Sequence, residues 1–178
     1  MAELSQFRLW WLLHFAQPVH FRTLLRTLSE TPPQSLLEVG SLDLGRTELL
    51  VRVVRHAAPQ GRFRYVGISR FEEAGGPQVK QVYRTLRELD TEVVLLPGRL
   101  AEALPRWANH LAGIDVILLW HPEVLRPDDR LWFYIPRMLS ESGRVLMEWS
   151  DGRRTRWAVV SKEEAIRRAE AVVRRRAA

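Results

Sequence analysis

Five short apolar segments, separated by stretches with helical periodicity, most constrain how this chain can fold. The segments rich in Val, Ile and Leu are Ser35–Gly40, Phe63–Ser69, Glu92–Leu96, Ile114–Trp120 and Arg144–Trp149. Helical stretches lie between them at about 46–57, 77–89, 100–111 and 128–140. Strands that are apolar on both faces and alternate with helices indicate a parallel sheet covered on both sides. Because crossovers are right-handed, we expect an α/β fold, a doubly wound parallel sheet in the order 3-2-1-4-5.

The two ends of the chain extend this core. Residues 4–30 have helical spacing and are divided by Pro18, while 155–161 reads as a strand antiparallel to the fifth one. A final helix is expected at about 162–176, packed through Ile166, Ala169 and Val173. We therefore expect one domain over 1–178, with a helical cap (1–33), a βα core (34–150) and a hairpin strand with a basic helix (151–178).

The turn after the first strand is the most informative segment for function. It carries Gly40 and Gly45 and leads into the next helix. In doubly wound sheets, ligands bind at the carboxyl ends of the strands, where the strand order reverses. Gly40 would allow a ligand to approach the backbone closely, and Gly45 would tighten the start of the helix. We therefore expect a ligand site at this turn.

The sequence Glu38-Val39-Gly40-Ser41-x-x-Gly45-x-Thr47 resembles a motif of class I S-adenosylmethionine-dependent methyltransferases, in the variant found in catechol O-methyltransferase-like families. The resemblance covers residues 35–150 and implies a Rossmann-like methyltransferase fold with S-adenosylmethionine as cofactor. The cofactor-binding residues that it implies are Glu38, Gly40, Ser41 and Gly45 at the first strand, and Ser69, Arg99, Leu100 and Trp120 after the next three.

Three positions depart from the family pattern. Ser69 stands where the family has an acidic residue for the ribose hydroxyls, and Arg99 follows Gly98 where an Asp or Asn is common. Leu119-Trp120-His121-Pro122 matches neither the aspartate of the metal-dependent enzymes nor the motif of the amino-methylating ones. We expect no metal and nominate His121 as the catalytic base, since an imidazole titrates near neutral pH. A catalytically degenerate binding or scaffold domain is the alternative.

Two other nucleotide sites fit the same turn less well. Residues 40–47 match a phosphate loop with Arg46 in place of the lysine, but Asp43 would then lie beside phosphates. Ser69-Arg70 would suit a 2′-phosphate of a dinucleotide, but the G-x-G-x-x-G motif is absent.

Charge and aromatic residues bear on partners and location. Residues 152–178 carry nine basic and three acidic residues, which accounts for the whole net charge of +6. Because the rest of the chain is formally neutral and its N-terminal helices are aromatic, we expect a small-molecule acceptor; the basic tail makes nucleic acid bound through 153–176 the alternative. One of Trp10 and Trp11 is expected to pack on the domain and the other to cover a pocket, contact a second subunit or be exposed. The later tryptophans are expected in or near the core: Trp107, Trp132, Trp149 and Trp157. Without cysteine, a signal peptide or a membrane span, we expect a cytoplasmic protein, with a homo-oligomer left open.

Overall fold

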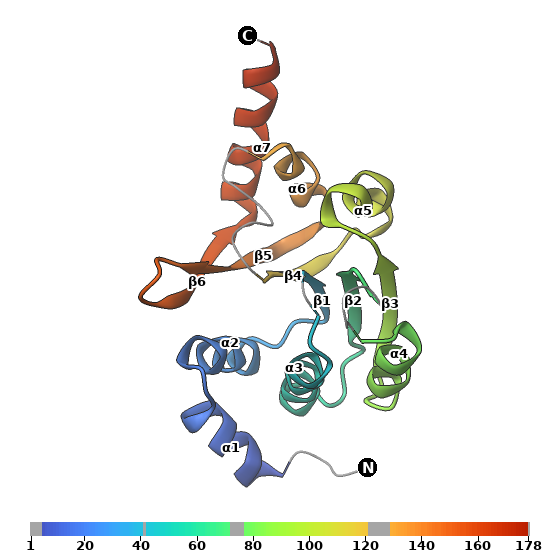
Figure 1. The fold of residues 1–178 in the computed structure, drawn as a ribbon, viewed down its shortest axis with the longest axis vertical. Helices are drawn as coiled ribbons and strands as arrows, with labels where there is room; N and C mark the ends of the chain where they lie inside the picture. The colour runs from blue at the N-terminus through green and yellow to red at the C-terminus, as the bar shows by residue number, and fades with distance from the viewer. Residues whose placement is uncertain (1–4, 41, 72–76, 121–128, 178) are drawn as a thin grey trace.

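A single six-stranded sheet runs through the centre of the molecule. The computed structural model describes residues 5–40, 42–71, 77–120 and 129–177 (Figure 1). The strands lie in the order β3-β2-β1-β4-β5-β6, and all neighbours are parallel except β5 and β6. Their bounds are β1 Ser35–Val39, β2 Arg64–Ser69, β3 Glu92–Pro97, β4 Ile114–Leu119, β5 Leu139–Ser150 and β6 Thr155–Ser161. The predicted fold class, strand order and antiparallel last strand are confirmed.

Helices cover both faces of this sheet (Figure 1). One face packs against α2 (Val19–Glu30), α3 (Leu44–Ala57) and α4 (Val79–Arg87). The other packs against α5 (Leu100–Trp107), the 3-10 helices η1 (Ala108–His110) and η3 (Arg130–Phe133), α6 (Ile135–Met138) and α7 (Lys162–Ala177). Each face has its own apolar cluster, as β1 shows by directing Leu36 to one and Leu37 to the other. This alternation is the reason that the strands are apolar on both faces.

The N-terminal segment forms two helices, as Pro18 predicted. α1 (Gln6–Phe15) begins after Ser5, whose hydroxyl accepts the Arg8 N–H, and α2 begins after Pro18. α2 buries four large side chains on the sheet: Phe21, Leu24, Leu25 and Leu28. Its first turn is tied to the last two strands, because the Trp157 indole donates to the His20 carbonyl (2.8 Å) and His20 Nε2 lies 3.1 Å from Glu148 Oε1.

The helix predicted over 128–140 is wrong at its end. α6 ends at Met138 and β5 begins at Leu139, well before the predicted Arg144. The pairing of β4 with β5 changes register between Ile114 and Val116, so the early part of β5 is irregular. Gly143 permits this bulge, because a Cβ there would lie 2.8 Å from the Ile114 carbonyl oxygen.

Several predictions of side-chain burial are also wrong. Trp10 and Trp11 are both 49% exposed, so neither is buried, and Trp107 (42%) and Trp149 (39%) lie partly in solvent. α7 packs through Ala165 and Val172, while Ile166 and Val173 face outward. The buried face is displaced by one residue from the predicted one, and Arg168 on this side stacks its guanidinium on the Trp132 ring. Among the described helices, none is both long and apolar enough to cross a bilayer.

Candidate ligand site at the carboxyl edge of the sheet

The predicted site residues gather where β1, β2, β3 and β4 end. The sheet order reverses between β1 and β4, and this switch point is where doubly wound sheets bind ligands. Hydrogen bonds connect the first residues beyond the strands to their neighbours: Gly40 N–H to the Ile68 carbonyl (3.2 Å), Gly98 N–H to Ser69 (3.0 Å) and Trp120 N–H to Val39 (3.1 Å). Ser41 and His121 lie outside the described residues, so their roles stay predictions.

Gly40 is required by the protein's own backbone. Its φ is +121°, and a Cβ there would lie 3.0 Å from the Trp120 carbonyl oxygen and 3.2 Å from the Trp120 Cβ. A side chain at this position would therefore collide with the end of β4. The group that approaches the Gly40 backbone closely is therefore Trp120 and not, as we expected from the sequence, a ligand. This contact is sufficient to explain why a glycine occupies the position.

Gly45, in contrast, is exposed at the start of α3. Among the described residues, the nearest group to a Cβ there would be Asp43 Oδ1 at 3.5 Å, an ordinary contact. Asp43 precedes the helix and accepts the Arg46 N–H (2.8 Å), while the amides of Leu44 and Gly45 belong to the first turn, which lacks carbonyl partners within the helix. The N–H groups of Leu44 and Gly45 therefore lie at the positive end of the helix dipole, next to the Asp43 carboxylate that already caps this turn.

Glu38 forms the centre of a buried hydrogen-bond network and is only 1% exposed. Its Oε2 accepts from the hydroxyls of Thr47 (2.8 Å) and Tyr65 (2.7 Å), and its Oε1 accepts from the Trp120 indole N–H (2.5 Å). The network therefore joins β1, β2, β4 and α3 beneath the turn. With three protein donors on its two oxygens, Glu38 has the geometry of a positioning residue for the Gly40–Gly45 turn.

The network also sets the protonation of its members. Burial raises the pKa of the Glu38 carboxyl above its ordinary value, while the bonds from Tyr65, Thr47 and Trp120 and the charge of Arg46 oppose this shift. Burial, followed by the charge and hydrogen bond of Glu38, raises the pKa of Tyr65 well above its ordinary value. Tyr65 therefore stays a neutral hydrogen-bond donor at neutral pH.

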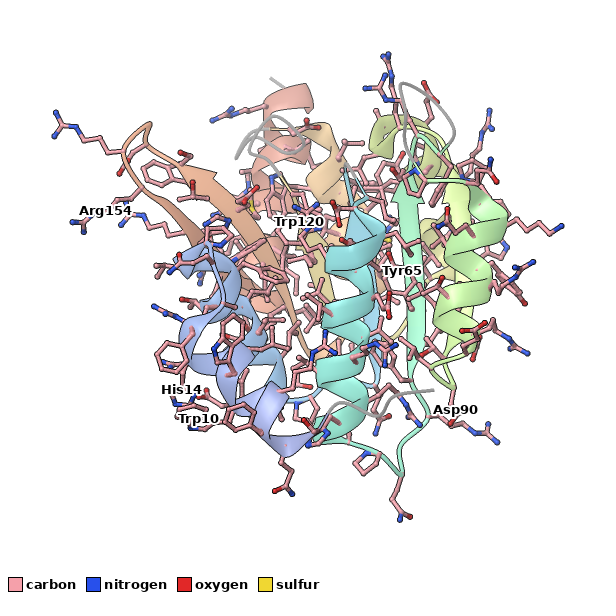
Figure 2. The ribbon with its side chains drawn as sticks, turned by 60° about the horizontal axis from the view of Figure 1, so that its bottom comes forward. Trp10, His14, Tyr65, Asp90, Trp120 and Arg154 are labelled. Atoms are coloured by element: carbon pink, nitrogen blue, oxygen red, sulfur yellow. The ribbon has the colours of Figure 1, made fainter. Side chains whose placement is uncertain are left out.

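Trp120 belongs to the core and not to the surface of the site. It is 1% exposed, meets Trp157 edge-on with ring centroids 5.0 Å apart, and carries the Arg46 guanidinium 3.7 Å above its own ring. Figure 2 shows Trp120 and Tyr65 inside the molecule. Its indole is therefore a support for the turn, and the part of Trp120 next to Gly40 is its backbone.

The ends of β2 and β3 contribute three predicted residues. Ser69 is 7% exposed and pairs with Pro97. Leu100 is buried as the first residue of α5, whereas Arg99 is exposed at the position preceding that helix. Gly98 has a φ of +127°, and its Cβ position is open except for Glu102 Oε2 at 3.6 Å. In the described segment that follows β2, residues 70 and 71, no carboxylate occurs; Glu72 and Glu73 lie outside it.

Sequence reasoning missed that Tyr65, Thr47 and Arg46 act together around Glu38. A signal was present in β2, where Gly67 follows Tyr65 by two residues on the same face. A Cβ on Gly67 would lie 3.2 Å from the Tyr65 hydroxyl, so the glycine makes room for the ring to reach Glu38. Gly67 pairs with Glu38 in the sheet, which explains why the tyrosine two residues earlier reaches it.

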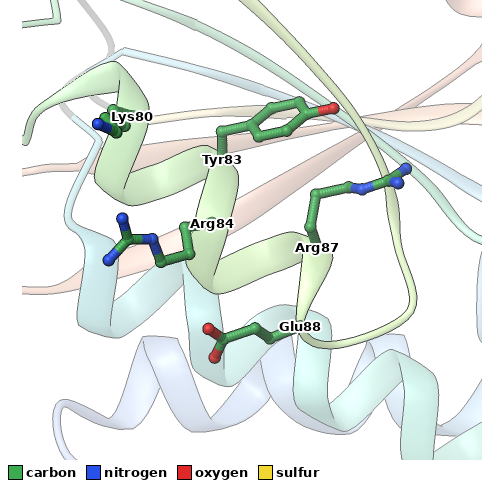
Figure 3. A pocket seen from close by; sticks show the side chains of 5 residues that line it. All are labelled: Lys80, Tyr83, Arg84, Arg87 and Glu88. Carbon is green, nitrogen blue, oxygen red and sulfur yellow. The ribbon is translucent and has the colours of Figure 1, made fainter.

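Two hollows on the surface lie away from this edge. One, of about 480 Å³, lies on the exposed side of α4 and is lined by Lys80, Tyr83, Arg84, Arg87 and Glu88 (Figure 3). The other, of about 430 Å³, lies near the beginnings of β2 and β3, at the opposite end of the strands. Neither includes a predicted site residue. Within the part of the chain that the structure describes, no three side chains of His, Asp or Glu gather as metal ligands.

No family model matches this chain, and no curated protein matches its sequence. Solved structures do match its fold. A putative protein-L-isoaspartate O-methyltransferase of Plasmodium falciparum, in complex with S-adenosyl-L-homocysteine, matches with a TM-score of 0.55 and 12% identity over 83% of this chain and 67% of that one. An O-methyltransferase of Bacillus cereus, also in complex with S-adenosyl-L-homocysteine, matches with a TM-score of 0.55 and 16% identity over 90% of this chain and 71% of that one.

A third match is the O-methyltransferase TomG of Streptomyces achromogenes, in complex with S-adenosylmethionine. Its TM-score is 0.51 and its identity 17%, over 89% of this chain and 69% of that one. At such identities the likeness shows the fold alone, and the fold is the α/β fold of these methyltransferase structures, as the resemblance at Glu38–Thr47 implied.

Proposed function

We propose that this protein binds S-adenosylmethionine over the Gly40–Gly45 turn and transfers its methyl group to a small acceptor. The observation that carries the proposal is the open first turn of α3 at the switch point of a methyltransferase-like sheet. The similar structures named above hold S-adenosylmethionine or its product, which supports the same ligand class here.

The described residues fit the methionine part of this cofactor better than its ribose. Gly45 leaves room for the methionine part, whose carboxylate would meet the N–H groups of α3 and whose ammonium group would offset the Asp43 carboxylate beside them. On the ribose side, Ser69 provides a hydroxyl where the family has a carboxylate, and Arg99 is the exposed side chain beyond β3. We therefore expect binding with weaker ribose contacts than a carboxylate would give.

The chain's own contribution to methyl transfer is positioning and proton removal. S-adenosylmethionine, when bound, supplies an electrophilic methyl group, so the protein needs to align the acceptor and exclude water. Glu38 and its donors hold the turn in place. We propose His121, in the segment after β4, as the base for an acceptor that must lose a proton, without a metal ion.

Binding can be separated from folding with a pair of glycine variants. Gly45→Leu would fill the open face of α3 and should lower the affinity for S-adenosylmethionine in titration calorimetry at least tenfold. Gly61→Leu, at a turn away from the carboxyl edge where a Cβ is 3.7 Å from the Ala58 carbonyl, is the matched control and should bind like the wild type. Both variants should unfold cooperatively. Equal affinity in the two variants would contradict the proposal.

A binding or scaffold domain without catalysis is the second candidate. It is favoured by Ser69 at the ribose position and by a buried Glu38 whose two oxygens already accept three protein donors. Titration with S-adenosylmethionine, ATP and NADPH distinguishes the candidates. Binding of the first alone supports the methyltransferase, binding of ATP or NADPH alone indicates a different nucleotide site, and no binding supports the degenerate domain.

A further inference from the structure

Helix α1 is apolar on two opposite sides. Leu12 is buried and, with Leu9 and Leu13, packs into the cluster that includes α2. The other side carries four aromatic residues that remain in solvent: Phe7 (73% exposed), Trp10 (49%), Trp11 (49%) and Phe15 (51%). A helix that is apolar around its circumference is normally buried on all sides. Here only the leucine side is covered.

The outward side forms a continuous surface, the α1 aromatic face, made of Phe7, Trp10, Trp11, His14 and Phe15. Spacings of three and four residues place these side chains together on the helix. The Trp10 ring lies 4.9 Å from His14, 5.5 Å from Phe15 and 6.2 Å from Phe7, centroid to centroid, and Figure 2 shows Trp10 and His14 at the outer boundary of the molecule. Rings that already pack on each other lose little freedom when a partner covers them.

The area of this face suits a protein partner. Aromatic side chains bury about 150–250 Å² each, so the exposed fractions of Phe7, Trp10, Trp11 and Phe15 amount to roughly 450 Å². A stable interface buries about 800 Å² on each partner, so these residues alone would supply roughly half of it.

The charges around the face favour a second copy of this chain over a membrane surface. Arg8 and His14 are the basic residues of α1, which has no acidic residue, whereas helices that lie on membranes are rich in Lys and Arg. Arg22 and Arg26 of α2 donate to the carbonyls of His14 (2.6 Å) and Leu13 (2.5 Å), and so fix the end of α1. The α1 aromatic face itself contains no Lys, Arg, Asp or Glu, so two copies of it can pack ring against ring.

We propose that two copies of this protein associate through the α1 aromatic face, in a two-fold symmetric dimer. In such an interface the same patch is buried on both subunits, so the contact is closed and forms no filament. α1 lies on the side of α2 away from the sheet (Figure 1), so this association leaves the carboxyl edge of the sheet accessible in both subunits. The dimer therefore stands independently of the proposed methyl transfer.

Light scattering after gel filtration tests the association. The wild type should have twice the mass of one 20.7 kDa chain at micromolar concentration. The double variant Trp10→Glu/Trp11→Glu should raise the dissociation constant of the dimer, by about 30-fold for each tryptophan replaced, which is the usual effect of a central interface residue. Tyr83→Glu, at an aromatic residue that is 46% exposed on α4, is the matched control and should remain dimeric. The leucine side of α1 is untouched, so circular dichroism should show both variants folded.

A cysteine cross-link provides a second readout that needs no loss of structure. The chain contains no cysteine, so Phe7→Cys or His14→Cys introduces a single thiol. At least one should give a covalent dimer under mild oxidation, and Tyr83→Cys should not. A wild type that is monomeric at micromolar concentration in the light-scattering experiment would overturn the proposal, as would a Trp10→Glu/Trp11→Glu variant that remains dimeric. Binding of a monomer to phosphatidylglycerol vesicles would also overturn it, in favour of a membrane surface.

Discussion

Removing one hydroxyl from the network around Glu38 tests how strongly it stabilises the turn. Tyr65→Phe deletes the O–H donor that lies 2.7 Å from Glu38 Oε2 and keeps the ring that packs over Gly67, so no cavity forms. Both groups are buried, and water cannot replace the lost bond. Depriving a buried acceptor of a donor costs about 1–3 kcal/mol, so we expect the unfolding free energy to fall by about that amount.

Urea titration and thermal unfolding measure this loss. For a chain of this size, the expected decrease corresponds to a lowering of Tm by roughly 2–12 °C. Tyr83→Phe is the matched control, because Tyr83 is exposed and its ring only flanks Arg87, at 5.9 Å, so its unfolding free energy should stay within about 0.5 kcal/mol of the wild type. If Tyr65→Phe also stays within that limit, the Glu38 network does not stabilise the fold as argued.

Three further predictions concern the same edge of the sheet. Because burial raises the pKa of Glu38, the native state holds the Glu38 proton more tightly than the unfolded chain does. The unfolding free energy should therefore fall as pH rises from about 4.5 through the raised pKa. In urea titrations at several pH values, Glu38→Gln should remove this dependence on pH, and an unchanged dependence would refute the argument. Gly40→Ala places a Cβ 3.0 Å from the Trp120 carbonyl oxygen at a φ of +121°, so it should lower the unfolding free energy by roughly 1–3 kcal/mol. The control Gly61→Ala should lower it far less, and equal unfolding curves for the two variants would contradict this prediction. If the protein is an enzyme, His121→Asn should reduce turnover by about 10²–10⁴ with little change in cofactor affinity, and EDTA should have no effect; an active variant would exclude His121 as the base.

The arrangement of the sheet could be predicted because it depends on simple patterns. Buried parallel strands must be apolar on both faces, and Pro18 can only divide a helical stretch. The early part of β5 could not be predicted, because Ser140, Glu141, Ser142 and Gly143 lack the apolar character of a strand. Their extended conformation depends on the bulge opposite Ile114 and on the Ser140 hydroxyl, which donates to Asp115 Oδ1 (2.8 Å). These contacts join segments that are distant in sequence.

The site was predictable in position and not in its internal contacts. The motif from Glu38 to Thr47 located the turn, since a glycine-bearing strand–turn–helix lies at the carboxyl edge in any sheet of this order. The bond from Trp120 to Glu38 joins residues 82 positions apart, and only the pairing of β1 with β4 brings them together. The burial of Trp10 and Trp11 was overestimated because apolar periodicity cannot distinguish a helix face covered by the same chain from one that is left in solvent.

A crystal structure in complex with S-adenosyl-L-homocysteine tests the central proposal most directly. We expect the ligand over the Gly40–Gly45 turn, with its methionine carboxylate at the N-terminus of α3 and its nucleoside between Ser69–Phe71 and Arg99–Leu100. The Glu38 network should be intact beneath it, with Trp120 still buried. A ligand bound elsewhere, for example in the hollow on α4, would contradict the proposed site, and crystals soaked at high ligand concentration that show no ligand at this turn would contradict cofactor binding itself.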